Sequence, residues 1–234
     1  MTTRRRARAV AWAVLEPWID WLPGTQLVRN LVASRRLRRA FADAPRRTLA
    51  ELGEDELACV TGRVRPVGPM LEAPLSRRVC AYYTVVVMEV SDGRRSQLAS
   101  EQSGVAFALE HDGHRAIIDP AYARISAGFD HATRSRGAFD ATPDQRSALD
   151  RLGLVRRDWF MTSSLEYREA ILELDELIAV VGAAVREPDP DAEVSGLYRE
   201  GGGTRLRLTG SARFPLLISD DPASISPPHA RRRR

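Results

Sequence analysis

The densest grouping of metal-capable side chains in the sequence is His111-Asp112-Gly113-His114, followed by Asp119. Imidazole nitrogens and carboxylate oxygens are ligands that zinc takes in proteins. The central Asp112-Gly113 pair is also a favoured two-residue hairpin turn, and apolar runs lie on both sides of it. A hairpin would leave the two histidines beside an exposed tip. We therefore expect a turn here, and neither a metal nor another cofactor.

Two further stretches carry groups suited to ion or phosphate binding. The run Glu187-Pro188-Asp189-Pro190-Asp191 offers carboxylates for calcium, but its prolines and the lack of a ligand-spaced loop favour a solvated linker. The three glycines at 201–203 precede an expected strand instead of a helix. They therefore favour a hairpin turn over a phosphate-binding loop.

The sequence contains none of the common catalytic motifs G-x-S-x-G, H-E-x-x-H, G-x-G-x-x-G or the phosphate-binding loop. All 35 basic residues are arginine, which excludes Schiff-base chemistry and a phosphate-loop lysine. Cys59 and Cys80 are too few for a disulfide framework or a zinc ligand set. Both lie in apolar runs, so we expect two buried thiols and predict no catalytic residue.

A mainly β fold with α additions must position these residues. From Thr48 onward, short apolar runs alternate with Gly, Pro and Asp, as in strands joined by turns. We expect a β-barrel or a sandwich-like domain of about nine strands. These are Leu57–Arg65, Val79–Val90, Gly104–Glu110, Arg115–Ile118, Arg168–Leu172, Leu177–Arg186, Val194–Tyr198, Thr204–Leu208 and Phe214–Ile218. The run VCAYYTVVVM is apolar at odd and even positions, which predicts a central strand covered on both faces, or one inside a closed barrel.

One inserted helix is expected among the strands, over residues 142–153. Thr142 and Gln145 form a capping box around Pro143 at the first helical position, and Gly153 supplies a left-handed stop. The helix should pack on the sheet as a lid. Its buried face is expected to consist of Ala148, Leu149 and Leu152.

Two segments of the sequence resemble each other. ELACVTG at 56–62 and ELIAVVG at 176–182 share the pattern E-L-x-x-V-x-G. A glycine at this place in a strand permits a bulge or a close strand crossing. The similarity predicts a pseudo-repeated β architecture, with shared strand chemistry as the alternative explanation.

The net charge of +4 is unevenly distributed. Residues 1–47 contain eleven arginines and three acidic residues, and Arg231 to Arg234 add four positive charges, so residues 48–230 carry a net charge of −8. We expect a basic amphipathic helical arm at 1–43, a linker at 44–47, a β domain at 48–221 and a disordered basic tail at 222–234. The acidic body disfavours the alternative of an OB-like barrel that binds nucleic acid.

The arm combines an apolar stripe with arginines and tryptophans, as in helices that lie at an anionic membrane surface. Packing of the stripe on the domain or on a partner is the alternative. The residues expected to face a membrane are Trp12, Trp18, Trp21, Arg35, Arg36, Arg38 and Arg39. The longest uncharged apolar run, Val79–Met88, is well short of the roughly 20 residues of a membrane-spanning helix. We predict no transmembrane helix, and a cytoplasmic or peripheral-membrane location.

The stretch from Gly62 to Tyr83 has the form G-R-V-x-P-V-G-P-x-L-x-A-P-L-S-x-x-x-C-A-Y-Y. It resembles the motif of the GIDE domain, also called the beside-a-membrane domain, found in mitochondrial membrane-anchored RING ubiquitin ligases and many bacterial membrane proteins. Weaker matches follow in order, and the resemblance covers residues 48–221. They are Phe107-Ala108-Leu109, Asp112-Gly113, Ile118-Asp119-Pro120, Tyr167-Arg168-Glu169, Leu177 to Gly182 and Pro215 to Asp220.

The resemblance implies a bacterial, membrane-proximal β domain that recognises a protein partner and catalyses no reaction. It transfers no catalytic residue. The RING finger of the ligases has no counterpart, because no cysteine follows Cys80. The alternative is a component of a ubiquitin-like ligase system whose catalytic RING module lies on another chain.

The stretch that carries the resemblance is predicted to be either a binding site or an architectural corner. Its prolines fix an extended backbone, and the Ser76 hydroxyl is expected to close a turn by bonding the backbone. If the stretch is a site, we expect the loop from Pro69 to Arg78 to bind the partner. The residues would be Pro69, Leu71, Pro74, Leu75, Ser76, Arg77 and Arg78.

Overall fold

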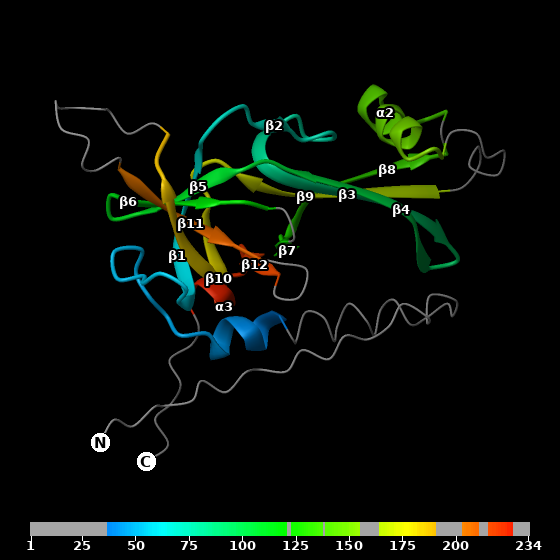
Figure 1. The fold of residues 1–234 in the computed structure, drawn as a ribbon. Coiled ribbons are helices and arrows are strands. Elements are labelled where there is room, and N and C mark those ends of the chain that lie inside the picture. Colours follow the sequence, from blue (N-terminus) through cyan, green and yellow to red (C-terminus); the bar gives the residue numbers. More distant parts are fainter. Residues whose placement is uncertain are drawn as a thin grey trace, which may run out of the picture. The chain divides into compact units, whose positions relative to one another are not determined.

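The computed structural model describes residues 37–120, 123–137, 139–154, 164–190, 203–210 and 215–226. The protein is mainly β, as the sequence predicts (Figure 1). Its strands are β1 (Leu57–Pro66), β2 (Leu71–Glu72), β3 (Val79–Ser91), β4 (Arg94–Gly104), β5 (Phe107–His111), β6 (His114–Ile118), β7 (Ala123–Ser126), β8 (Phe129–Arg136), β9 (Ser164–Glu173), β10 (Leu177–Pro188), β11 (Thr204–Thr209) and β12 (Leu216–Ser219). The described helices are α2 (Pro143–Arg151), α3 (Pro222–Ile225) and a helical segment at 37–43.

Five of these strands close into a barrel. The order is β1–β5–β6–β11–β10, and β10 pairs back to β1. Neighbours are antiparallel except for β6 and β11, which are parallel. This order, with its single parallel pair, is that of the OB fold, a five-stranded Greek-key barrel. The barrel alternative of the sequence prediction is therefore confirmed, and β12 and β7 extend the sheet from β10.

The two similar sequence segments are the strands that close this barrel. Residues 57–63 of β1 pair antiparallel with residues 177–183 of β10, and Val60 lies opposite Val180 at the centre. Each glycine admits a neighbouring strand: a Cβ on Gly62 would lie 2.8 Å from the carbonyl oxygen of Glu110, and one on Gly182 would lie 2.4 Å from Leu216. The predicted close strand crossing is present at Gly62, where the contact is with the β5 backbone, whereas at Gly182 the contact is with the end of the Leu216 side chain.

The turns before these two strands match as well. Asp55 and Asp175 both have a left-handed backbone, with φ of 58° and 64°. The next residue in each case is a glutamate whose carboxylate accepts from the backbone N–H three residues earlier, at 3.1 Å for Glu56 and 2.8 Å for Glu176. The similarity thus extends from sequence to turn geometry, and the two segments are related by a local two-fold.

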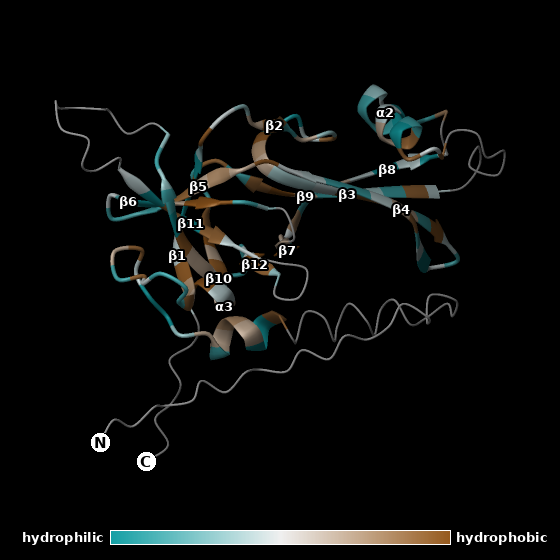
Figure 2. Cartoon of the chain, viewed as in Figure 1, coloured by the Kyte–Doolittle hydropathy of each residue, from teal (hydrophilic) through white to brown (hydrophobic). Residues whose placement is uncertain are grey.

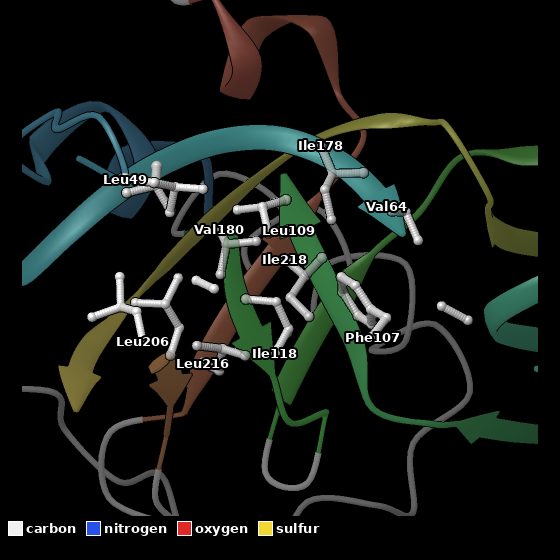
Figure 3. Packing of buried hydrophobic residues seen from close by; sticks show 14 of the residues in the cluster. Leu49, Val64, Phe107, Leu109, Ile118, Ile178, Val180, Leu206, Leu216 and Ile218 are labelled. Atoms are coloured by element: carbon white, nitrogen blue, oxygen red, sulfur yellow. The ribbon is translucent and has the colours of Figure 1, made fainter. Parts of the chain in front are cut away.

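Alternate residues of the barrel strands fill its interior (Figure 3). The buried set includes Val60, Val64, Phe107, Leu109, Ile118, Ile178, Val180, Leu206, Leu208, Leu216 and Ile218. Ala81 and Tyr82 of β3 and Leu172 of β9 belong to the same cluster. The barrel therefore shares its core with the start of the second sheet.

The second sheet is built from two insertions into the barrel. Residues 67–106, between β1 and β5, supply β2, β3 and β4, whereas residues 119–176, between β6 and β10, supply β8, α2 and β9. β3 pairs with β9 and joins the two insertions, while β2 and β4 pair with the other edge of β3 and β8 pairs with β9. Helix α2 covers one face of this sheet (Figure 1).

Helix α2 is where the sequence predicts it. The Thr142 side chain accepts from the Gln145 amide and the Gln145 side chain accepts from the Thr142 amide, so the capping box is complete. Gly153 has a φ of 67°, as a left-handed stop requires. Ala148 and Leu149 are fully buried and pack against β3 and β9, and Leu152 is half-buried.

Strands β4, β7 and β8, and the two-residue β2, lie where the sequence predicts no strand. Their residues are mostly polar, because β4 and β8 are edge strands with a wet face. For β4 a signal exists: Asp92 and Gly93 have φ of 48° and 74°, the geometry of a two-residue hairpin turn. The predicted strand Val194–Tyr198 lies outside the described residues.

The helical segment at 37–43 packs on the outside of the barrel. Phe41 is buried against Cys59, Val181 and Leu217, with Leu37 beside it. Arg46 donates hydrogen bonds to the Ser224 and Ile225 carbonyls of α3, the second at 2.7 Å. Packing on the domain thus accounts for this end of the apolar stripe.

Of the residues expected to face a membrane, two are described. Arg38 pairs with Asp221 at 3.1 Å, and Arg39 is exposed. The tryptophans of the arm, Arg35 and Arg36 lie outside the described residues, as does residue 227 onward of the predicted tail. The prediction of disorder is wrong for residues 222–225, which form α3. Among the residues that the structure describes, no helix has the length and hydropathy of a membrane span.

We expect Gly62→Ala to lower the free energy of unfolding by about 1–3 kcal/mol, because the added Cβ would overlap the β5 backbone. Gly68→Ala is the matched control, since a Cβ there meets nothing within 4 Å. It should change the free energy by less than about 0.5 kcal/mol. Urea unfolding followed by circular dichroism measures both, and equal values would contradict the close crossing.

Candidate functional site

The predicted binding loop forms a tight corner between β2 and β3. Leu71 and Glu72 pair with the first residues of β3, and the intervening turn is held by backbone bonds from Ala73 to Arg78 (2.8 Å) and from Arg77 to Ala73 (3.0 Å). Arg77 has a φ of 62°, a left-handed conformation that costs a non-glycine residue energy. Such a backbone persists only when its surroundings hold it.

Glu169 of β9 holds the corner by hydrogen bonds to its backbone. Its carboxylate is fully buried and accepts from the backbone amides of Leu75 at 2.7 Å and Ser76 at 3.0 Å. The predicted closure of the turn by the Ser76 hydroxyl is wrong: this buried oxygen has no hydrogen-bond partner. The carboxylate takes that role because one side chain satisfies two amides at once.

Two arginines of the loop are tied to acidic residues on four elements. Arg77 bonds Glu72 at 2.7 Å and Asp144, in the first turn of α2, at 2.6 Å. Arg78 bonds Asp130 of β8 at 2.6 Å and Glu173 of β9 at 3.4 Å. The bonds to Glu72 and Asp144 raise the pKa of Arg77.

These contacts give the loop an architectural role, because it joins β2, β3, β8, β9 and α2. Leu75 belongs to the core beneath α2, and Leu71 packs against a small cluster around Cys80. Pro69 is exposed and Pro74 half-buried. Partner binding by the stretch from Pro69 to Arg78 stays a prediction.

The predicted hairpin at Asp112-Gly113 is confirmed. Both residues have positive φ, 48° and 76°, and His111 pairs with His114 across the turn. Asp119 lies at the other end of β6, where it pairs with Arg207 at 3.5 Å. Within the described part of the chain, no group of three His, Cys, Asp or Glu residues is arranged to hold a metal ion.

Both cysteines are buried, as the sequence predicts. Burial raises the pKa of the Cys80 thiol to about 11, with a further contribution from the nearby Glu169 carboxylate. Burial also raises the pKa of Cys59, against the opposing effect of Arg46. Neither sulfur is therefore a thiolate at neutral pH, and neither is accessible as a nucleophile.

A pocket of about 310 Å³ lies where the barrel meets the second sheet. Its lining includes Tyr82, Gln102, Ser103, Ala106, Asp119 and Pro120. The Tyr82 hydroxyl donates to the Gln102 side chain at 2.9 Å, and burial raises the pKa of this tyrosine. The lining presents polar and apolar surface in similar proportion, and hydrogen-bonded polar groups of this kind fix orientation at recognition sites.

Sequence analysis did not find this pocket. Tyr82, Asp119 and Pro120 belong to separate motif blocks, and Gln102 lies on a strand that the sequence did not predict. The one sequence signal that pointed to the pocket was the order of these motif blocks along the chain, because that order indicates that the blocks belong to one domain. Their meeting in space depends on the barrel.

Comparison of the chain with models of protein families, with curated proteins and with solved structures finds no significant match. The GIDE resemblance therefore rests on the sequence motif and stays a prediction.

We expect Glu169→Ala to destabilise the protein by about 2–4 kcal/mol, because it leaves two amides in the corner without their acceptor. Glu72→Ala is the control. It removes an exposed ion pair with Arg77 and should cost less than about 1 kcal/mol. Faster tryptic cleavage after Arg77 or Arg78 in the first variant alone would locate the damage in the corner. Equal stability of the two variants would contradict the clamp.

Proposed function

We propose that this chain is a non-catalytic recognition domain of the GIDE type, which works beside a membrane and binds a protein partner. The observation that carries the proposal is the pocket between the barrel and the second sheet. It gathers Tyr82, Asp119 and Pro120 from two blocks of the motif. A partner's side chains or a short peptide segment would fit a pocket of this size.

Different parts of the motif have different contacts, and this difference supports recognition at the pocket. The loop from Ala73 to Arg78 uses its amides and both arginines to tie β8, β9 and α2 to the corner between β2 and β3. Tyr82, a few residues further along the chain in β3, lines the pocket. Rigid support next to a partly open pocket keeps the entropic cost of binding low.

A role in ubiquitin-like transfer is the alternative that the resemblance implies. Transfer through a thioester on this chain would require an accessible thiolate. Cys59 and Cys80 are both buried with raised pKa values, which favours recognition over this form of transfer.

Partner binding is tested by photo-crosslinking in cells. A photoreactive residue at Ser103, which lines the pocket, should give a discrete protein adduct. Ala106→Arg would fill the mouth of the pocket from an exposed position and should reduce that adduct about tenfold, as loss of a central contact does. Ala50→Arg, exposed and outside the pocket lining, is the matched control. An absent adduct, or one that Ala106→Arg leaves unchanged, would refute binding at this pocket.

Membrane proximity is tested by flotation with phosphatidylserine vesicles. The full chain should float, and a chain lacking residues 1–36 should bind at least about tenfold more weakly, because the truncation removes seven arginines. The truncation ends at residue 36, since Leu37 and Phe41 pack on the barrel and belong to the compact unit 37–234. Equal binding of the two chains, or none by either, would contradict the role of the arm.

A further inference from the structure

The sheet face opposite α2 is left open by the described residues. The sequence predicts that both faces of the apolar run in β3 are covered. Val85 and Val87 are indeed buried under α2, but Val86, Met88 and Val90, which alternate with them, are only half-buried. Within the described residues, the predicted cover on both faces is therefore complete only on the α2 side of this part of β3.

Strand register identifies the other residues on this face, because directly paired residues of an antiparallel sheet share a side. Val86 is paired with Ser100 and Arg168, Met88 with Gln97 and Glu166, and Val90 with Arg95 and Ser164. On β8, Ala132, Arg134 and Arg136 continue these three rows. Figure 2 shows the hydrophilic character of β4 and β8 on either side of the central pair.

The charges on this face are unusually one-sided. Its described charged residues are Arg95, Arg134, Arg136, Arg168 and Glu166. A solvated protein surface ordinarily mixes both signs. Here four arginines accompany one carboxylate, although residues 48–230 as a whole carry a net charge of −8.

Glu166 organises three of these arginines. Its side chain is 3% exposed and accepts from Arg168 Nε at 2.6 Å, from Arg134 Nη2 at 3.0 Å and from Arg95 Nε at 3.2 Å. Burial raises the pKa of this carboxyl, but the three arginine bonds outweigh burial and lower it. The carboxylate therefore stays ionised and fixes the guanidinium groups in place.

The arginines around Glu166 keep guanidinium N–H donors that are exposed to solvent. Arg95 and Arg168 bond Glu166 through Nε, their Nη groups bond no other described residue, and their side chains are 46% and 36% exposed. Arg134 is 64% exposed. A guanidinium fork matches the geometry of phosphate oxygens. Three arginines and one carboxylate leave two positive charges, which balance the charge of about −1.5 to −2 on a phosphate monoester at pH 7.

An occupant that complements the charge of this face is anionic. The two ends of this chain are basic, so both would be repelled. A second copy would bring two arginine faces together, which like-charge repulsion opposes. A small soluble phosphate ester would bury little surface on an open sheet, whereas a headgroup displayed by a bilayer gains from simultaneous contact of the basic arm.

From these observations we infer that the open face of β8, β9, β3 and β4 binds the phosphate monoester headgroup of an anionic membrane lipid, through Arg95, Arg134 and Arg168. This inference rests on the proposed function beside a membrane, and it adds the lipid chemistry that the domain itself recognises. Val86, Met88 and Val90 lie next to the arginines and would contact the apolar part of the interface. Glu166 is the positioning residue of the site.

The test uses the full chain and vesicles of phosphatidylcholine that contain either phosphatidic acid or phosphatidylserine at equal surface charge. The variant R95Q/R134Q/E166Q/R168Q removes the site without leaving a buried carboxylate unpaired. We expect it to bind phosphatidic acid vesicles about tenfold more weakly, since each arginine at an anionic surface contributes to binding. Binding to phosphatidylserine vesicles should change by less than about threefold, because the arm supplies it.

The control variant Arg115→Gln with Arg124→Gln removes the same net charge from exposed positions on β6 and β7. It should leave both vesicle affinities unchanged, and thermal unfolding checks that both variants fold. Retained binding of phosphatidic acid by the quadruple variant, with loss on removal of residues 1–36, would overturn this inference and leave the proposed function standing. Equal losses on both lipids, or tighter binding of soluble glycerol phosphate or a phosphoserine peptide than of the vesicles, would also overturn it.

Discussion

The antiparallel pairing of β1 with β10 is the constraint on which the rest of the structure depends. It closes the five-stranded barrel, and it does so between strands that are separated in the chain by both insertions. Gly62 lets β5 approach β1 closely on its other side, because a Cβ there would overlap the backbone of Glu110. The turn from β9 into β10 then sets the position of β9, and β9 in turn provides the edge on which β3 pairs.

Two buried carboxylates on β9 hold the second sheet and its loops in place. Glu169 binds the corner between β2 and β3 through two amides, while Glu166, three residues earlier and on the opposite face, binds three arginines. One strand thus serves the architecture on its covered face and presents charge on its open face. The motif that resembles the GIDE family contributes chiefly to the covered side, which explains how it can be regular without being catalytic.

An OB-like barrel by itself does not specify a function, because this fold serves many kinds of ligand. In this chain the two insertions supply what the barrel lacks: a second sheet, a pocket at the junction, and an arginine face. Residues 48–230 carry a negative net charge, so the positive arginine face is a local exception within them. Residues 1–47 carry a positive net charge, like that face. Both features fit the proposed role of the domain at an anionic surface.

Local signals in the sequence determined the helix at 142–153, the hairpin at Asp112-Gly113, the buried cysteines and the mainly β class, because capping, turn and strand preferences act over a few neighbouring residues. The similarity of 56–62 and 176–182 was also visible, although the sequence could not say that the two strands pair. Only the tertiary structure decided the closed barrel, the polar edge strands β4 and β8, and the clusters around Glu169 and Glu166. Those groups meet through strand register between distant segments, and register is fixed by the packing of the whole core, which no short stretch of sequence contains.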